Sequence, residues 1–254
     1  TGDLQWRFWT VPGPGEAGHE TWADDWDAWK TGGAAPWVTG SYDPDTNLTL
    51  WGTGNPVPMF DPEFRPGDNL YTDSVVAVDV DTGKLAWYFQ YTPNEAWDYD
   101  EEGVHQLYNT TINGVERAVV GHFSRSGFYY NLDRKTGEFI NANQYVAEVN
   151  WTAGIDAKTG KPIEYDPNVE LQAYAKGVNP RAVAGEDGQP IIEFCPTAGG
   201  GVNYQPTAHN PLKGLSYGIG AEGCGAATLV HETPVEGGGN PKGYGKVFAG
   251  GIFS

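Results

Sequence analysis

The sequence predicts an all-β fold built from short antiparallel strands, and three observations support this prediction. The 254 residues include 36 glycines and 18 prolines, which interrupt helices and mark turns. Runs rich in β-branched and aromatic residues recur at short intervals, whereas the periodicity of amphipathic helices is nearly absent. The chain also has 10 Trp, 14 Tyr and 10 Phe, so it can bury enough apolar surface to fold around an aromatic core.

The predicted strands are short and separated by turns. In chain order they span residues 48–51, 75–80, 85–91, 117–123, 128–132 and 246–248. Two long stretches, residues 197–210 and 232–245, have the glycine and proline content of loops. Loops of this length are often functional.

A short pattern with Asp followed by Thr-Gly recurs between the predicted strands. It is complete in residues 77–87 (AVDVDTGKLAW), and residues 131–138, 156–161 and 1–6 match parts of it. Aspartates that bind the backbone, together with a glycine at positive φ, make tight hairpin turns. All-β repeats of this size that end in an aromatic residue predict β-propeller blades of four antiparallel strands. A two-sheet sandwich is the alternative.

The repeat also predicts that residues 1–254 are part of one propeller domain, truncated at both ends. The chain begins with the second half of the pattern, and residues 247–254 stop within or just after a strand. Each blade needs neighbours to cover its faces, so we expect the sequence to be a fragment of a longer domain.

The charge balance excludes two classes of partner. The chain has 15 Lys and Arg against 33 Asp and Glu, for a net charge of −18. Such a charge repels phosphate backbones and anionic lipid headgroups. No stretch approaches the ~20 continuous apolar residues of a membrane helix. We therefore expect neither nucleic-acid binding nor membrane insertion.

The two cysteines, Cys195 and Cys224, are too far apart in the sequence for the CxxC spacing of zinc or redox sites. Both lie beside turns rich in glycine or proline, which favours a disulfide over two unrelated buried thiols. A disulfide implies an oxidising compartment such as the periplasm. The five histidines show no paired metal spacing, and we expect them at the surface or in turns.

An acidic segment follows the predicted strand at 85–91. In an extended chain, residues two apart face the same way, so Asp98 and Asp100 are expected to project together. Two carboxylates a few ångströms apart cannot both stay ionised unless a cation or a proton intervenes. The pair therefore predicts a hard-cation site or an acid/base pair. The alternative is an acidic solvated loop, but the alternating Trp97 and Tyr99 favour burial of one side.

A second candidate site lies where the predicted strand at 48–51 ends. Gly52, Gly54 and Asn55 follow this strand, and prolines come next. An asparagine carbonyl oxygen is a neutral ligand that suits calcium-like ions, and the prolines would hold the loop rigid. Most Gly-Asn-Pro runs are ordinary turns, so this signal is weak by itself.

Taken together, these motifs resemble the pyrroloquinoline quinone (PQQ) dependent alcohol dehydrogenases, which include the methanol dehydrogenases. Residues 77–87 resemble the tryptophan-docking repeat that ties the blades of that family's eight-bladed propeller together. The chain corresponds to somewhat under half of such an enzyme. The resemblance implies oxidation of an alcohol by hydride transfer to the C5 carbonyl of metal-bound PQQ. It also implies a cytochrome c-type electron acceptor in the periplasm, and it leaves a homodimer open.

The resemblance assigns the base and part of the metal site. Asp98 resembles the family's catalytic base, which also contacts the metal, and Asn55 resembles its asparagine ligand. Asp100 resembles the extra carboxylate of the lanthanide-dependent members. A trivalent ion needs more negative ligands than calcium does, so a lanthanide is favoured and calcium is the alternative.

The resemblance also assigns three contacts to PQQ. Trp37 resembles the tryptophan on whose face the PQQ ring lies, although an ordinary core tryptophan is the alternative. Arg125 resembles the cationic residue that hydrogen-bonds the quinone oxygens, although a surface arginine on a turn is the alternative. Asn203 resembles the asparagine near the quinone carbonyls.

Other positions agree with the family or depart from it. Cys195 and Cys224 match the positions of a family disulfide. Met59 stands where methanol dehydrogenases place a large tryptophan over the substrate cavity. Methionine is smaller and adaptable, which favours a substrate larger than methanol. The family's glutamate ligand would precede Thr1, so we expect this chain to hold only part of the metal site.

The alternative to a dehydrogenase is a binding protein without catalytic activity. Propellers also serve as binding proteins, so the alternative is a noncatalytic, metal-stabilised β-propeller that binds a polymer or scaffolds an assembly. A calcium-stabilised sugar-binding β domain is a third reading. Both predict metal without quinone.

Overall fold

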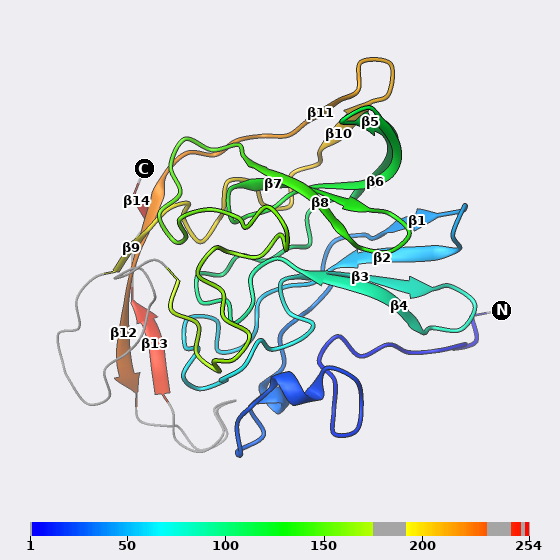
Figure 1. Cartoon of the computed structure of the whole chain (residues 1–254). Coiled ribbons are helices and arrows are strands. Elements are labelled where there is room, and N and C mark those ends of the chain that lie inside the picture. The colour runs from blue at the N-terminus through cyan, green and yellow to red at the C-terminus, as the bar shows by residue number, and fades with distance from the viewer. Residues whose placement is uncertain (1, 175–191, 233–244, 250–251, 254) are drawn as a thin grey trace.

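The computed structural model describes residues 2–174, 192–232, 245–249 and 252–253. Figure 1 shows two four-stranded sheets side by side, with loops gathered between these two sheets and a third sheet near the C-terminus. Two short 3-10 helices, His19–Thr21 and Ala28–Thr31, precede the first sheet. Among the described residues, no helix is long and apolar enough to cross a membrane.

Each of the two large sheets is an antiparallel meander whose strands keep their chain order. This is the arrangement of a propeller blade, and it confirms the four-stranded units that the repeats predict. The first sheet comprises β1 (Ser41–Asp43), β2 (Leu48–Gly52), β3 (Ser74–Asp79) and β4 (Leu85–Gln90). The second comprises β5 (Gln106–Ile112), β6 (Val115–Phe123), β7 (Phe128–Asp133) and β8 (Phe139–Gln144).

All six predicted strands are present, but the sequence did not reveal three of the four strands that lie at the edges of the two large sheets. β1, β5 and β8 each lie at the edge of a sheet. Their side chains are mostly half-buried or exposed, and polar residues such as Asn109 and Asn141 occupy them. An edge strand covered on fewer sides does not need the alternation of apolar residues by which inner strands are recognised.

The remaining strands lie closer to the C-terminus. A third sheet has the order β13 (Gly245–Ala249), β12 (Cys224–Glu232) and β14 (Ile252–Phe253), and β9 (Ile192–Phe194) also pairs with β12. β10 (Ala208–Asn210) and β11 (Leu215–Tyr217) form a hairpin. Most of the stretch 197–210 is a loop, as predicted, and β10 takes its last residues. Of the predicted loop at 232–245, residues 233–244 lie outside the described residues.

The Thr-Gly turns supply contacts between successive repeats. A Cβ atom at Gly83 would lie 2.6 Å from the ring of Trp6, and one at Gly137 would lie 2.5 Å from the ring of Trp87. Both glycines have positive φ, at 70° and 75°, so their conformation and the approaching ring both require glycine. The Trp6 Nε1–H also donates to the Val80 carbonyl at 2.6 Å. The tryptophan that closes one repeat therefore packs on the turn of the next.

The largest core contains aromatic side chains from both sheets and from the segments that follow them. Trp97 and Trp151 are fully buried, and their ring centroids lie 5.2 Å apart. Tyr99 is also buried and contacts both rings. Large aromatic side chains bury much apolar surface, so this cluster anchors the acidic segment 98–102 firmly to the core.

The predicted disulfide is present. Cys195 and Cys224 are bonded, with their Cα atoms 4.3 Å apart. The bond ties the loop after β9 to the first residue of β12. The Cys195 N–H also donates to Asn150 Oδ1 at 2.6 Å, so this loop is held at its start.

Candidate active site

The loop after β2 and the acidic segment 98–102 lie in direct backbone contact. The Glu101 N–H donates to the Thr53 carbonyl at 3.1 Å. A Cβ atom at Gly52 would lie 2.0 Å from the Glu101 carbonyl oxygen, so only glycine permits this approach. The Gly-Thr-Gly sequence at the end of β2 therefore brings the acidic segment against the loop that carries Asn55.

Gly54 leaves space for two carboxylates. A Cβ atom at Gly54 would lie 2.4 Å from Glu102 Oε1 and 2.9 Å from Asp100 Oδ1. The Asn55 N–H donates to Asp100 Oδ1 at 2.6 Å, which is a short, charge-assisted hydrogen bond. The Asn55 Nδ2–H donates to the Pro56 carbonyl at 2.8 Å. This bond leaves the Asn55 side-chain oxygen as the atom available to a ligand.

A buried glutamate shapes the turn that presents Asp98. Glu95 Oε1 accepts hydrogen bonds from the N–H groups of Trp97 and Tyr99, the latter at 3.0 Å. Asp98 has a φ of 70°, so it lies in a turn and not in the extended run that the sequence predicts. Its side chain is 25% exposed, whereas Trp97 and Tyr99 are buried. The aromatic side of the segment is buried as predicted, and the solvated-loop alternative is wrong.

Arg125 joins the two aspartates. Its Nη1 lies 3.2 Å from Asp100 Oδ2 and 3.8 Å from Asp98 Oδ2, and it donates to the Asp98 carbonyl oxygen at 2.6 Å. The arginine side chain is buried. A second loop closes on it, since a Cβ atom at Gly200 would lie 2.6 Å from Arg125 Cβ. Arg125 is thus a fixed positive charge among carboxylates and not a surface arginine on a turn.

Trp37 borders this cluster and is not an ordinary core tryptophan. Its side chain is 49% exposed, and the Arg125 guanidinium lies 5.9 Å from its ring centroid. Tyr204 meets the Trp37 ring edge-on at 6.5 Å. The adjacent Asn203 donates from Nδ2 to the Gly199 carbonyl at 3.4 Å. The structure therefore joins five of the six candidate residues by direct contacts and places Asn203 on the loop beside them.

Burial raises the pKa of two carboxyl groups in the cluster. It raises the pKa of Asp98 to about 7, with the charge of Asp100 adding to the rise and Arg125 opposing it. It raises the pKa of Glu102 to about 9, and Asp100 again adds to the rise. Burial and a neighbouring negative charge both disfavour the ionised form of a carboxyl group. A cation bound beside these two groups would favour their ionised forms.

The available atoms fit a hard cation and a flat quinone. The cluster offers carboxylate oxygens and the amide oxygen of Asn55, and oxygen ligands suit calcium and similar hard ions. The half-exposed face of Trp37, with the cationic Arg125 beside it, suits a flat ring that carries oxygen atoms. Both halves of the candidate site thus match the chemistry that the resemblance implies.

A separate group of metal-type side chains does not form a metal site. Among the residues that the structure describes, Glu148, Cys195 and Cys224 have ligand atoms within 4.8 Å of one another. Both sulfur atoms are used in the disulfide, so they are not free to bind an ion. The carboxylates of the candidate site are spaced more widely, with Arg125 bridging Asp98 and Asp100.

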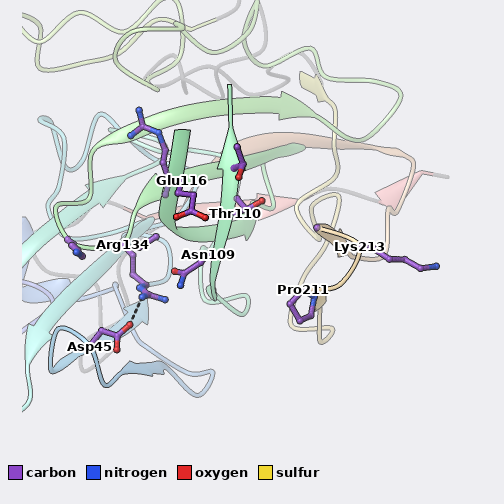
Figure 2. Close-up of a pocket in the computed structure, with 12 residues that line it drawn as sticks. Asp45, Asn109, Thr110, Glu116, Arg134, Pro211 and Lys213 are labelled. Atoms are coloured by element: carbon purple, nitrogen blue, oxygen red, sulfur yellow. Dashed lines mark hydrogen bonds and ion pairs between the residues drawn. The ribbon is translucent and has the colours of Figure 1, made fainter. Parts of the chain in front are cut away.

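A large polar cavity lies away from this cluster. It has a volume of about 860 Å³, and Asn109, Glu116 and Lys213 are among its lining residues. Figure 2 shows Arg134 at its edge, paired with Asp45 at 2.9 Å. This ion pair links the turn after β7 to the turn between β1 and β2. The cavity is a polar hollow where the two blades meet, and it holds none of the candidate residues.

The sequence analysis missed a polar network behind the site, and its placement of the histidines at the surface is wrong for two of them. His105 and His122 are 3% and 2% exposed, and their rings stack with centroids 4.0 Å apart. His122 Nε2 pairs with Glu101 at 2.7 Å, and the Tyr91 hydroxyl bonds His105 Nε2 at 3.0 Å. Partners distant in the sequence make their burial possible, so no local pattern could reveal it.

Glu102 was also missed. The two-residue spacing that singled out Asp98 and Asp100 continues to Glu102, so this spacing could have identified Glu102 as a third acidic residue of the site. The sequence prediction considered only Asp98 and Asp100 of this segment, whereas the structure also buries Glu101 and Glu102.

Comparisons with known proteins agree with this geometry. Residues 1–149 match the family model of the PQQ-type glucose, ethanol and alcohol dehydrogenase β-propeller domain. The chain is 42% identical over 205 residues to quinoprotein alcohol dehydrogenase PedH of Pseudomonas putida, a match that covers 80% of this chain and 32% of that protein. It is 36% identical over 198 residues to the lanthanide-dependent methanol dehydrogenase of Methylorubrum extorquens, covering 78% of this chain and 31% of that protein.

A solved structure shows the same architecture. A europium-containing methanol dehydrogenase superposes with a TM-score of 0.74 at 33% identity, over 91% of this chain and 37% of that one. This likeness and the two blade-like sheets confirm the β-propeller fold. The chain spans about a third of the length of the curated relatives it matches.

Proposed function

Because the chain belongs to the family of PQQ-type glucose, ethanol and alcohol dehydrogenase β-propeller domains, we propose that it is part of a PQQ-dependent alcohol dehydrogenase. The chain would carry the catalytic base, part of the metal site and part of the PQQ site. The contact of Arg125 with both Asp98 and Asp100, beside the half-exposed Trp37, carries this proposal. The buried guanidinium of Arg125 connects the oxygen-rich metal site to the aromatic face of Trp37.

Asp98 is the proposed catalytic base, which removes the hydroxyl proton of the alcohol. A carboxylate is a weak base, so its effect depends on a fixed position close to the substrate. The Glu95-bonded turn supplies this position, and the partial exposure of Asp98 leaves it open to a substrate. PQQ and the cation, when bound, supply the two-electron acceptor for the alcohol's hydride. The alcohol leaves as an aldehyde or ketone, with its proton on Asp98.

Two side chains would hold and orient PQQ from this part of the chain. Arg125 keeps its charge and donates hydrogen bonds to quinone oxygens, where it stabilises the negative charge that develops during the reaction. Trp37 supplies the flat face on which the ring lies. Asn203, on the adjoining loop, would complete the contacts near the quinone carbonyls.

Asn55, Asp98 and Asp100 are the proposed metal ligands from this chain. Arg125 offsets one negative charge of the cluster and leaves the remainder for the ion. An additional carboxylate favours a trivalent ion over a divalent one, so a lanthanide is the proposed cation and calcium is the alternative.

The substrate and the surroundings of the enzyme follow from two further positions. Met59 is 36% exposed, and its carbonyl accepts a hydrogen bond from Arg65 at 2.7 Å, so a small, adaptable side chain stands on a fixed backbone. This favours an alcohol larger than methanol. The Cys195–Cys224 disulfide supports an oxidising compartment such as the periplasm. A cytochrome c-type electron acceptor is proposed from the family resemblance alone.

Substitution of the base tests the proposal. In the full-length protein, Asp98→Asn should retain PQQ and metal while dye-linked alcohol oxidation falls by about 100-fold or more, the contribution typical of a general base. Turnover like that of the wild type would refute the assignment. Asp100→Ala is the companion variant: activity with lanthanides should be lost, and activity with calcium retained or gained.

The noncatalytic alternative is separated by spectroscopy. A scaffold or sugar-binding propeller would bind a metal without quinone. The purified full-length protein should instead show the near-ultraviolet absorption of bound PQQ, and an empty spectrum after reconstitution with PQQ and a lanthanide would favour the binding module.

A further inference from the structure

Two adjacent buried glutamates of the acidic segment differ in their partners. Glu101 is satisfied, since its carboxylate pairs with His122 and accepts a hydrogen bond from Ser124. Glu102 is 3% exposed, and among the described residues neither of its carboxylate oxygens has a hydrogen-bond partner. A buried carboxylate without a partner is strongly unfavourable unless a positive charge compensates it. No hydrogen bond to a described residue therefore holds the Glu102 carboxylate, and Arg125 is the positive charge that opposes its own.

Glu102 is aimed at the same point as a proposed metal ligand. The position that a Cβ atom of Gly54 would take lies 2.4 Å from Glu102 Oε1, 2.9 Å from Asp100 Oδ1 and 3.4 Å from the Ala35 carbonyl oxygen. Oxygen atoms from two segments that are distant in the sequence, Ala35 on one and Asp100 and Glu102 on the other, thus converge beside the Cα atom of Gly54. The side-chain oxygen of Asn55 belongs to the next residue. Oxygen atoms that converge in this way are the ligands that hard cations take.

We propose that Glu102 is a further oxygen ligand of the bound cation, in addition to Asn55, Asp98 and Asp100. This inference rests on the proposed function, because it requires a cation at the cluster that Arg125 joins. With Glu102, three carboxylates face one guanidinium, and the excess negative charge grows. A trivalent ion gains more from this charge than a divalent ion does. Glu102 would therefore strengthen selection for lanthanides.

Europium is the probe for this ligand, because the decay of its luminescence in H₂O and D₂O reports the number of coordinated water molecules. The full-length protein carrying PQQ would be stripped of metal and titrated with Eu³⁺. Glu102→Gln keeps the shape of the side chain and removes its charge. Glu148→Gln is the matched control, since it makes the same change at an exposed glutamate of the separate Glu148–Cys195–Cys224 group.

Loss of a ligand predicts two changes together. Glu102→Gln should bind Eu³⁺ about 10-fold or more weakly, since even outer partners of a metal site contribute 10- to 100-fold. Its bound Eu³⁺ should also hold more coordinated water than the wild type, because solvent replaces the missing oxygen. Glu148→Gln should match the wild type in both measurements. Circular dichroism of the metal-free variants checks that they are folded.

The outcomes separate this inference from the proposed function. If Glu102→Gln binds Eu³⁺ with the affinity and hydration of the wild type, Glu102 is not a ligand, and the proposed function stands. If affinity falls without any change in hydration, Glu102 acts through its charge alone, and the ligand assignment is overturned. If the wild type itself binds no Eu³⁺, both the proposed metal site and the role of Glu102 fail.

Discussion

A single methyl group at Gly54 should disable the metal site. The Cβ atom of Gly54→Ala would lie 2.4 Å from Glu102 Oε1 and 2.9 Å from Asp100 Oδ1. An ordinary contact is at least about 3.4 Å, so the glutamate oxygen must retreat by about 1 Å and the aspartate oxygen by about 0.5 Å. The Asn55 N–H···Asp100 hydrogen bond, at 2.6 Å, would be strained by the same movement.

The size of the effect follows from this displacement. A misplacement of about 1 Å in a catalytic arrangement costs on the order of 100-fold in rate. Insertion of a methyl group into a packed site lowers the free energy of unfolding by about 1 to 3 kcal/mol. We therefore expect Gly54→Ala to fold, to lose most of its metal and to oxidise alcohols about 100-fold more slowly.

The assay combines metal analysis of the full-length protein with dye-linked alcohol oxidation. Gly220→Ala is the matched control, because the nearest atom to its Cβ, on Tyr145, would be 4.0 Å away. The control should behave like the wild type. Full metal content and normal turnover in Gly54→Ala would refute the reasoning, since the carboxylates could not then be arranged around that point.

Two further predictions concern stability. The disulfide closes a loop between Cys195 and Cys224, which are separated by 29 residues, and this closure contributes about 3 to 4 kcal/mol to stability. Substitution of both cysteines by serine should lower the free energy of unfolding by that amount. An unchanged denaturation midpoint would contradict this prediction. Lys161 has its pKa lowered from 10.5 to about 8 by burial, with Asp68 opposing the shift. The unfolded chain therefore holds a proton that the native state releases between these pH values, so the stability of the wild type relative to Lys161→Met should rise as the pH increases from about 8 to 10.5. A constant difference in unfolding free energy would exclude this linkage.

The inner strands of the blades, the edge strand β4 and the turns of the repeats could be read from the sequence. β2, β3, β4, β6 and β7 lie within a residue or two of their predicted positions. Inner strands carry runs of β-branched and aromatic residues, and an Asp-x-x-Thr-Gly turn is encoded by the conformational preferences of its own residues. The docking of Trp87 on Gly137 follows from the same repeat. The edge strands β1, β5 and β8 lack such apolar runs, which explains why they were missed, whereas the edge strand β4 contains three aromatic residues.

The sequence also indicated most of the candidate site, but not how it is assembled. Residue type and spacing singled out Asp98, Asp100 and Asn55, and family resemblance added Arg125. The sequence predicted that strand alternation would bring the aspartates together. In the structure, Asp98 lies in a turn with a φ of 70°, and the two carboxylates meet through Arg125.

Local conformational preference and hydrophobic periodicity thus determined the blades, because each acts within a few neighbouring residues. Only the tertiary structure decided which charges are buried and what they face. Gly52 and Gly54 let two loops from different parts of the chain touch, and this contact turned a segment that looks solvated into a buried cluster. The satisfied Glu101 and the unpartnered Glu102 are identical in type and adjacent in sequence. Burial and partners are non-local quantities, so the difference between them exists only in the folded protein.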